Sequence, residues 1–410
     1  MPTTSVYVRV MFTTLFLDLN SYFASCEQQM RPELRGKPMA VAPMDVLTTC
    51  VIAASYEAKA FGVKTGVMVG DAIKMCPNLI VVPARMDEYI RFHHKILTAI
   101  DTCVPVAAVH SIDEVSCTLL GRERNPDYAV DLAHRIKRAI LKVGCCLRCS
   151  IGLATNTVLA KVATDMMKPD GLVCIPKTEL PKFLFKLKLI DLPGIGPRME
   201  RRLFAHGIET VEQLCAMSPQ QLRAAWGSVL GARWWYSLRG EEIPVEVSRR
   251  KSLGHQHVLP PKYRNDAGAR SIMVRLIDKA ATRLRHEGLS AAAILFWVKC
   301  REGRDWVRQF GLLDGRDTLE MTRIFGEAWA AGPPSRPLIA GVTLLGLLPF
   351  VGLTGSLFME DRRRSALSAA LDRLNLKYGS GTVHPASMIG AVESAPMRIA
   401  FKTIPDLDLI

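Results

Sequence analysis

Short apolar runs alternate with amphipathic stretches over the first 176 residues of this 410-residue chain. The Lys-Pro-Asp-Gly sequence at residues 168–171 ends the last of these stretches, because proline and glycine favour a turn. The alternation is typical of an α/β domain around a central sheet. We expect strands at residues 11–19, 39–42, 79–82, 106–112, 115–119 and 145–152, and helices at residues 56–61, 69–76, 85–104, 128–143 and 156–167.

The pattern changes after residue 176. Residues 180–238 are expected to be helical, and the charged residues 240–251 read as a linker. Residues 252–348 return to mixed structure in the order β-α-β-β-α-β, which is typical of a small sheet with two helices on one face. An amphipathic helix at residues 362–377 and a tail follow, so the whole chain is expected to be a multidomain α+β protein.

Two segments raise the question of a membrane. Residues 337–359 carry no charge and are long enough to span a bilayer, but Pro349 and four glycines interrupt them. We therefore expect buried strands there and no membrane association. Arg9 and Asp18 interrupt the N-terminal apolar run, which disfavours a signal peptide, and Met11 is an alternative start to Met1.

The charge and the cysteines restrict partners and compartment. The formal net charge of +14 favours a polyanionic partner such as nucleic acid, without choosing among DNA, RNA and an anionic membrane. The 11 cysteines are an odd number and scattered, a poor fit to a disulfide framework. Cys146 and Cys149 form a lone C-x-x-C pair, a weak zinc signal, which we interpret as structural. A reducing cytoplasm fits best.

Three carboxylates lie at the ends of two expected strands. Asp18 ends one strand, and Asp113 and Glu114 end another that would lie beside it. Neighbouring carboxylates repel each other unless a cation neutralises them, and Mg²⁺ prefers such oxygen ligands. Two such ions would activate a hydroxyl nucleophile and stabilise a pyrophosphate leaving group. On spacing alone, ordinary solvated acids remain an equal alternative.

The sequences around these acids resemble a known family. Residues 17–27 (Leu-Asp-Leu-Asn-Ser-Tyr-Phe-Ala-Ser-Cys-Glu) and 111–114 (Ser-Ile-Asp-Glu) are similar to the two catalytic motifs of the Y family of translesion DNA polymerases. Residues 36–38 and 55–63 resemble its finger segment, and residues 160–171 resemble parts of its palm. The resemblance extends over residues 13–380.

The resemblance implies a right-hand polymerase. Its parts would be a palm of mixed sheet plus helices, small fingers, a helical thumb and a β-α-β-β-α-β little finger. The implied boundaries are 1–21 and 88–176 for the palm, 22–87 for the fingers, 177–240 for the thumb, 241–251 for a basic linker, 252–350 for the little finger and 351–410 for a C-terminal helix and tail.

The resemblance also implies site residues. Asp18, Asp113 and Glu114, with the backbone carbonyl of Leu19, would hold two Mg²⁺ ions. Phe23 would be the steric gate that rejects a ribose 2′-hydroxyl, although without the motif it reads as a core aromatic residue.

The incoming triphosphate would lie near Tyr22, Tyr56, Lys59 and Lys168, where cations offset phosphate charge. Without the motif, both lysines read as solvated surface residues. Three positions depart from the family: Lys59 replaces a frequent arginine, Ala53 replaces a hydroxyl residue, and Asn20 replaces a common acid that is not a metal ligand.

Two segments are expected to contact the DNA backbone. Gly194 and Gly196 lie between helical stretches and resemble a helix-hairpin-helix element, in which backbone N–H groups approach a phosphate, although a lone G-x-G is often only a turn. Arg249, Arg250 and Lys251 match the linker before the little finger and are either phosphate contacts or a solvated charge run.

The resemblance also implies a C-terminal peptide that docks on a sliding clamp. Two peptides are candidates for it, and the alternative for each is that it is only tail. One begins at Thr354 and ends at Phe358, and the other begins at Asp406 and ends at Ile410.

Taken as a whole, the resemblance implies a monomeric, low-fidelity DNA polymerase that adds dNTPs to a primer-template across damaged DNA. Its motifs point both to DNA polymerase IV and to the catalytic subunit of DNA polymerase V. A non-catalytic, polymerase-like DNA-binding scaffold is the alternative, which the complete set of three acids disfavours.

Overall fold

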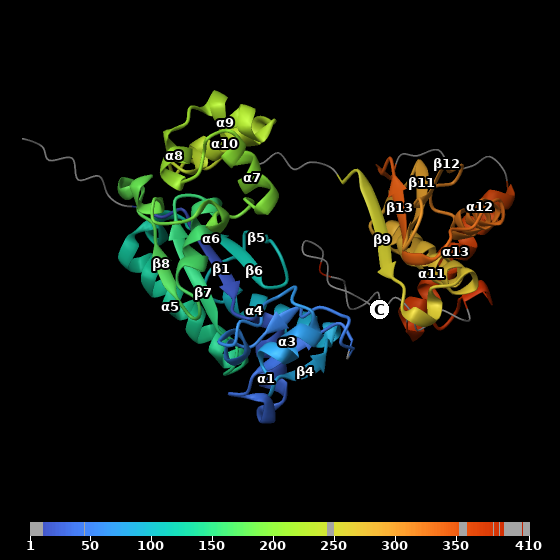
Figure 1. Ribbon diagram of the computed structural model, residues 1–410, viewed down its shortest axis with the longest axis horizontal. Coiled ribbons are helices and arrows are strands. Elements are labelled where there is room, and N and C mark those ends of the chain that lie inside the picture. Colours follow the sequence, from blue (N-terminus) through green and yellow to red (C-terminus); the bar gives the residue numbers. More distant parts are fainter. Residues whose placement is uncertain are drawn as a thin grey trace, which may run out of the picture. The chain divides into compact units, whose positions relative to one another are not determined.

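The computed structural model describes residues 11–44, 46–243, 250–351, 359–379, 381–384, 386–388 and 404. The chain divides into two compact units (Figure 1), whose main parts are Met1–Val245 and Glu246–Arg398. We describe each unit by itself. Together they confirm the expected multidomain α+β fold.

The first unit is organised around a five-stranded sheet in the order β5-β6-β1-β7-β8. The central strand β1 pairs antiparallel with β6 and β7, and β8 is parallel to β7. Because strand side chains alternate, Phe16 and Asp18 share one face of β1, and Leu15 and Leu17 share the other. The strands are β1 (Thr14–Leu19), β5 (Ala108–Val109), β6 (Glu114–Thr118), β7 (Cys149–Ala154) and β8 (Leu172–Cys174).

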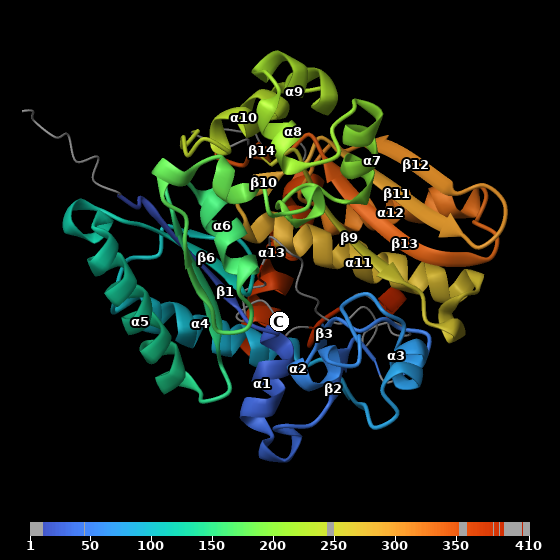
Figure 2. The same ribbon diagram turned by 60° about the vertical axis from the view of Figure 1, so that its left-hand side comes forward.

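Three long helices pack around this sheet. Helices α4 (Met86–Asp101) and α5 (Pro126–Val143) contact each other, as Figure 2 shows, whereas α6 (Thr157–Met166) packs against β1, β7 and β8. Gly152 allows the close approach of α6, since a Cβ atom there would lie 2.0 Å from the carbonyl oxygen of Ala160. This contact brings Lys161 of α6 over the Asp18 face of β1.

A smaller sheet follows α1 (Tyr22–Met30) and has the strand order β3-β2-β4. It contains β2 (Met39–Ala42), β3 (Ala53–Ala54) and β4 (Ile80–Pro83), with α2 (Tyr56–Lys59) and α3 (Val69–Met75) packed nearby. The strands expected at residues 39–42 and 79–82 are confirmed.

The rest of the first unit is helical, as expected. Within residues 177–243 there is no strand, and buried side chains such as Leu203, Leu214 and Leu222 form the core of this part. The helices are α7 (Pro197–Ala205), α8 (Val211–Ala216), α9 (Pro219–Trp226) and α10 (Val229–Ser237).

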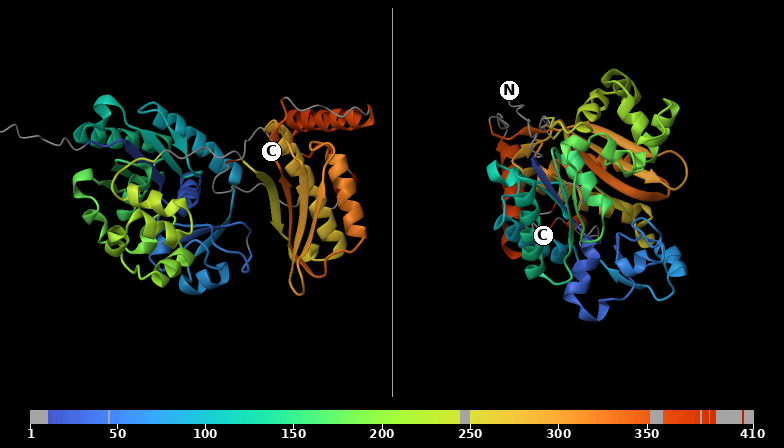
Figure 3. Two further views of the ribbon diagram at one scale, coloured as in Figure 1. Left: turned by 90° about the horizontal axis from the view of Figure 1, so that it is seen from above. Right: turned by 90° about the vertical axis from the view of Figure 1, so that its left-hand side faces the viewer.

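The second unit confirms the β-α-β-β-α-β order. Its antiparallel sheet has the order β12-β11-β13-β9, and the helices α11 (Asp266–His286) and α12 (Thr318–Ala330) lie on one face (Figure 3). Helix α13 (Met359–Tyr378) packs on α12. The strands are β9 (Ser252–Val258), β11 (Ala293–Cys300), β12 (Trp306–Gly311) and β13 (Pro337–Leu345), beside a short pair formed by β10 (Leu289–Ser290) and β14 (Leu348–Pro349).

Two local expectations are wrong. Residues 106–119 do not form one continuing strand: β5 and β6 form a hairpin in which Ala108 lies opposite Ser116, and Asp113 lies in the turn. The apolar runs on both sides of the acids fit either arrangement. The strand expected from residue 145 begins at Cys149, because residues 145–148 precede it as a turn and loop.

The uncharged run that raised the question of a membrane is a strand over Pro337–Leu345. Among the helices that the structure describes, none is both long and apolar enough to cross a bilayer.

Candidate active site

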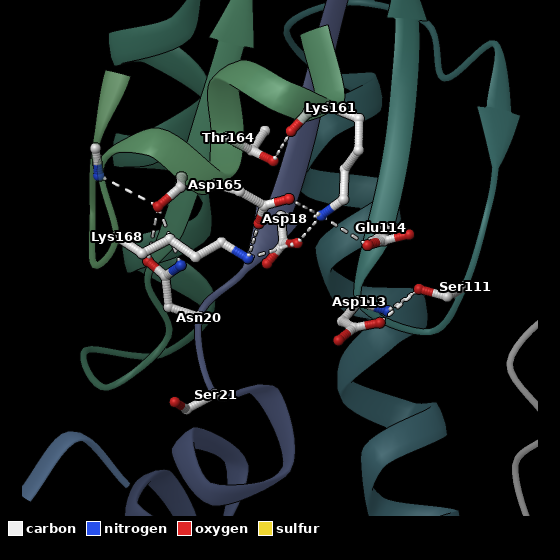
Figure 4. Close-up of polar contacts among 12 residues, drawn as sticks. Asp18, Asn20, Ser21, Ser111, Asp113, Glu114, Lys161, Thr164, Asp165 and Lys168 are labelled. Carbon is white, nitrogen blue, oxygen red and sulfur yellow. Dashed lines mark hydrogen bonds and ion pairs between the residues drawn. The ribbon is translucent and has the colours of Figure 1, made fainter. Parts of the chain in front are cut away.

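Asp18 and Glu114 lie directly opposite each other in the antiparallel pairing of β1 with β6. The side chain of Asp18 is only 8% exposed, whereas that of Glu114 is 28% exposed. The sequence places both acids at strand ends, and the sheet register brings them together. Figure 4 shows Asp18, Glu114 and Asp113 near the same end of the two strands.

Two lysines surround these carboxylates. The Nζ atom of Lys161 lies 2.5 Å from Asp18 Oδ2, 2.9 Å from Glu114 Oε1 and 3.3 Å from Asp165 Oδ2. The Nζ atom of Lys168 lies 2.8 Å from both Asp18 Oδ2 and Asp165 Oδ1. Burial alone would lower the pKa of each lysine, but the neighbouring carboxylates, Asp18 first, raise it above its ordinary value. The site is therefore a tightly paired cluster of opposite charges.

Asp113 is held in the hairpin turn. Its backbone carbonyl accepts a hydrogen bond from Leu19 N at 2.8 Å, and its Oδ1 accepts one from Ser111 Oγ at 2.5 Å. Burial raises the pKa of Asp113, the charges of Asp18 and Glu114 raise it further, and the Ser111 hydrogen bond opposes them. A nearby cation would therefore favour the ionised form of Asp113.

The donor set fits a hard divalent cation. Asp18 and Glu114 already converge on one positive atom, Lys161 Nζ, and carboxylate oxygens are the ligands that Mg²⁺ prefers. Over the described residues, no three His, Cys, Asp or Glu side chains are close enough together to hold an ion as they stand. Asp18 and Glu114 instead form ion pairs with the lysine ammonium groups. A bound metal would therefore replace part of these lysine contacts.

The aromatic residues after β1 pack toward α4. The Phe23 ring stacks on that of Tyr89, with centroids 4.6 Å apart and an interplanar angle of 17°. Tyr22 is buried, and its hydroxyl donates to the backbone carbonyl of Tyr89 at 2.6 Å. Stacking on Tyr89 thus holds the Phe23 ring on one of its faces. Tyr22 is buried beside this pair and is not exposed at the surface.

Lys59 and Tyr56 form a second positively charged group. Lys59 Nζ lies 4.4 Å from the centroid of the Tyr56 ring and donates to Ser21 Oγ at 2.7 Å. Burial, together with the charge of Lys168, lowers the pKa of Lys59. Burial raises the pKa of Tyr56. An anion between Lys59 and Lys168 would relieve their mutual repulsion.

The sequence did not single out Lys161, Asp165 or Ser111 as site residues. Lys161, Asp165 and Lys168 are spaced four and three residues apart, so the first two share one face of α6 and the third follows it. This spacing was visible in the sequence, but it is equally typical of a solvated helix surface.

The expected DNA-contact residues lie elsewhere in the fold. Gly194 has a φ of +94°, and Gly196 directly precedes α7 with no atom within 4 Å of a Cβ built there. Arg250 forms an ion pair with Glu287, and Lys251 is exposed. Arg249 and both clamp-docking peptides, Thr354 to Phe358 and Asp406 to Ile410, lie outside the described residues.

Comparison with family models gives three matches. Residues 17–165 match the impB/mucB/samB family, and residues 250–350 match the C-terminal domain of that family. Between them, residues 186–227 match a SAM-like helix-hairpin-helix tandem.

Curated proteins and solved structures agree with these matches. DNA polymerase IV of Moorella thermoacetica is 33% identical over 394 residues, which cover 92% of this chain and 96% of that protein. DNA polymerase IV 1 of Bacillus subtilis is 28% identical over 403 residues, with coverage of 94% and 95%. A Y-family DNA polymerase chimera of Dbh and Dpo4 superposes with a TM-score of 0.69 at 25% identity, over 82% of this chain and 99% of that one. The structure of DinB from Sulfolobus solfataricus superposes with a TM-score of 0.55 at 25% identity. The superposition covers 81% of this chain and 98% of that one.

Proposed function

Because the chain belongs to the impB/mucB/samB family of Y-family DNA polymerases, we propose that its cluster of three acids is the catalytic centre for DNA synthesis. The protein is a template-directed DNA polymerase of low fidelity that serves synthesis across damaged DNA. The observation that carries this conclusion is the similarity to a DNA polymerase IV over 96% of that enzyme's length. The same similarity favours a polymerase IV-like subgroup.

We assign the four parts of the polymerase as follows. The palm is the sheet of β1 and β5–β8 with its helices, the fingers are the smaller sheet region, and the thumb is the helical part through α10. The sheet of the second unit is the little finger. We keep the boundaries at residues 21, 87, 176 and 240, and at 252 and 350, as part of this proposal.

Polymerases of this family use divalent metals, and we assign two Mg²⁺ ions to Asp18, Asp113, Glu114 and the carbonyl of Leu19. When bound, these ions would activate the primer 3′-hydroxyl and stabilise the pyrophosphate leaving group. Lys161 pairs with both Asp18 and Glu114 and so links the two carboxylates. Ser111 orients the carboxylate of Asp113.

The dNTP triphosphate is assigned to Lys59, Tyr56 and Lys168. The lowered pKa of Lys59 reflects its burial and a neighbouring cation, which an anionic ligand would compensate. Phe23 is assigned as the steric gate under the sugar, with Tyr22 as part of its support. Replacing Phe23 by Ala should admit ribonucleotides, and unchanged sugar selectivity would contradict this assignment.

Primer extension tests the catalytic assignment. With Mg²⁺ and dNTPs we expect the wild type to extend a primer, and Asp113→Ala to reduce kcat by at least about a thousand-fold. The matched control is Asp131→Ala, because Asp131 is a largely exposed acid of α5 paired with Arg135. An Asp113→Ala variant as active as the control would make the assignment of Asp113 wrong. A wild type that adds no nucleotide would favour a non-catalytic scaffold.

Primer-template DNA is the proposed partner of Gly194 and Gly196 and, separately, of Arg249, Arg250 and Lys251. A Cβ at Gly196 meets no protein atom, so Gly196→Ala should fold normally and obstruct only an approaching phosphate. We expect Gly196→Ala to weaken DNA binding about three-fold in a titration at fixed salt, and unchanged binding would contradict a phosphate contact at Gly196.

We also propose that one of the two C-terminal peptides docks on a sliding clamp. Deletion of each peptide in turn, followed by a clamp-binding assay, would test this.

A further inference from the structure

The turn that follows Lys168 is held by hydrogen bonds from two parts of the fold. Lys137 of α5 has a side chain that is 13% exposed, and its ammonium group reaches three oxygen atoms. It donates to the backbone carbonyl of Cys149 at 2.8 Å, to that of Asp170 at 2.7 Å and to Asp170 Oδ1 at 2.7 Å. All three protons of this ammonium group are therefore used to join α5 and β7 to the turn.

Asn20 holds the same turn from the end of β1. Its side chain is buried, its Oδ1 accepts from the backbone N–H of Asp170 at 2.7 Å, and its Nδ2 donates to Ser150 Oγ at 3.1 Å. Ser150 Oγ in turn accepts from Gly171 N at 3.3 Å. Figure 4 shows Asn20 beside the backbone from which Lys168 extends toward Asp18.

The residues of the turn match this arrangement. Asp170 has a φ of +56°, a conformation that an aspartate adopts more readily than most residues. A Cβ atom on Gly171 would lie 1.8 Å from the carbonyl oxygen of Met167, so glycine is required. The backbone of the turn is therefore fixed. The ammonium group of Lys168 pairs with the carboxylates of Asp18 and Asp165, which a phosphate group would replace.

We propose that Lys137 and Asn20 are positioning residues for nucleotide binding. They hold the turn so that the ammonium group of Lys168 is presented to the triphosphate of the incoming dNTP without further ordering of the backbone. Preorganisation of this kind improves affinity because the ordering entropy is lost on folding and not on binding. The proposal rests on the role that we assigned to Lys168.

The amide at position 20 suits this task. It accepts from one group and donates to another at the same time, whereas a carboxylate offers only acceptors. The replacement of the family's common acid by Asn20 therefore has a structural consequence, although position 20 is not assigned as a metal ligand.

Steady-state kinetics of single-nucleotide insertion, with the full chain, Mg²⁺ and a primer-template, tests the proposal. We expect Lys137→Met and Asn20→Ala each to raise the KM for dNTP roughly five-fold while changing kcat less than about two-fold. Lys137→Arg keeps a multiple donor and should restore most of the affinity. Lys142→Met is the control, because Lys142 is an exposed lysine of the same helix.

A double-mutant cycle separates positioning from general destabilisation. If Lys137 acts through Lys168, Lys137→Met should add little to the KM of Lys168→Met, so that the double variant resembles Lys168→Met alone. Fully additive effects, or a KM unchanged in both Lys137→Met and Asn20→Ala, would overturn the positioning proposal. If Lys168→Met itself leaves the KM unchanged, the assignment of Lys168 is wrong and the positioning proposal fails with it.

Discussion

Asp18 and Glu114 face each other across adjacent antiparallel strands, and the ammonium group of Lys161 lies within 2.9 Å of both carboxylates. Like charges directly opposite each other destabilise a sheet. The protein thus keeps an unfavourable pair of acids in its central sheet and neutralises it with a lysine from α6. The stability of the metal-free protein should depend on that lysine.

Lys161→Met removes the cation and leaves Asp18 with one fewer partner. Breaking a buried ion pair on one side costs about 3 kcal/mol, so we expect a clearly lower Tm in EDTA. Because Mg²⁺ would neutralise the same carboxylates, the stabilisation by Mg²⁺ should be larger in this variant than in the wild type. Thermal unfolding of both proteins with EDTA and with Mg²⁺ measures this, and Lys64→Met, at an exposed position, is the control. Equal Mg²⁺ effects in all three proteins would contradict the assigned metal site.

Glu27 supports the Phe23 side of the site. Its carboxylate is 0% exposed and contacts Arg85 at 2.7 Å and the hydroxyl of Tyr89 at 2.8 Å. Arg31, directly after helix α1, also contacts it. Burial alone would raise the pKa of Glu27, but the hydrogen bonds from these three residues together lower it below its ordinary value. We expect Glu27→Gln to lower the free energy of unfolding at pH 7 by about 2 kcal/mol, because charge-assisted hydrogen bonds are lost.

The pH dependence of this effect has a defined sign. A carboxyl group with a lowered pKa stabilises the fold fully above its unfolded value of 4.5, and this contribution is lost as the pH falls through the lower folded value. The difference in stability between wild type and Glu27→Gln should therefore be constant from pH 7 to 5.5 and shrink below pH 4.5. Urea titrations across this range measure it, and a difference that grows on acidification would refute the argument.

His93 fixes the turn that carries Asp113. It is buried, and its Nδ1 lies 2.8 Å from the backbone carbonyl of Ile112, so this nitrogen carries the proton of the neutral ring. Burial lowers the pKa of His93 to about 4 from an ordinary value of 6.5. The unfolded chain therefore binds a proton first on acidification, and the stability due to neutral His93 is lost as the pH falls from 6.5 toward 4.

We expect the wild type to lose about 2 kcal/mol of stability between pH 7 and pH 5 that His93→Phe does not lose, because Phe cannot be protonated. The variant should be less stable than the wild type at pH 7, since the carbonyl of Ile112 loses its partner. Unfolding titrations at the two pH values measure both effects. Parallel losses in the two proteins would show that His93 is not the titrating group.

The sequence predicted strand β1, which carries Asp18, and most of β6, which begins at Glu114, because the alternation of apolar residues is a local property. The β5–β6 hairpin was not predicted, since the apolar residues on both sides of Asp113 and Glu114 fit a continuing strand equally well. The contacts of Asp170 with Asn20 and Lys137 join residues 150 and 33 positions apart, and no local pattern encodes them. Lys161 was visible at helical spacing, but only the packing of α6 on β1 places it over Asp18.

Helix α13 lies beyond the family's C-terminal domain, which ends at residue 350, yet it is attached to the folded second unit. Asp372 receives two hydrogen bonds from Arg285 of α11, at 2.5 and 2.8 Å, and the Arg285 side chain is only 7% exposed. Arg364 of α13 also pairs with the buried Asp317 at 3.1 Å. Removing the acid at position 372 would leave a buried guanidinium without its main partner.

We therefore expect Asp372→Ala to lower the free energy of unfolding of the second unit by about 3 kcal/mol. The control is Arg373→Ala at the next, exposed position, which should change it by less than about 0.5 kcal/mol. Hydrogen exchange of α11 amides in the full chain reports on this unit separately from the first. Unchanged protection of α11 in Asp372→Ala would show that α13 is not an energetic part of the second unit.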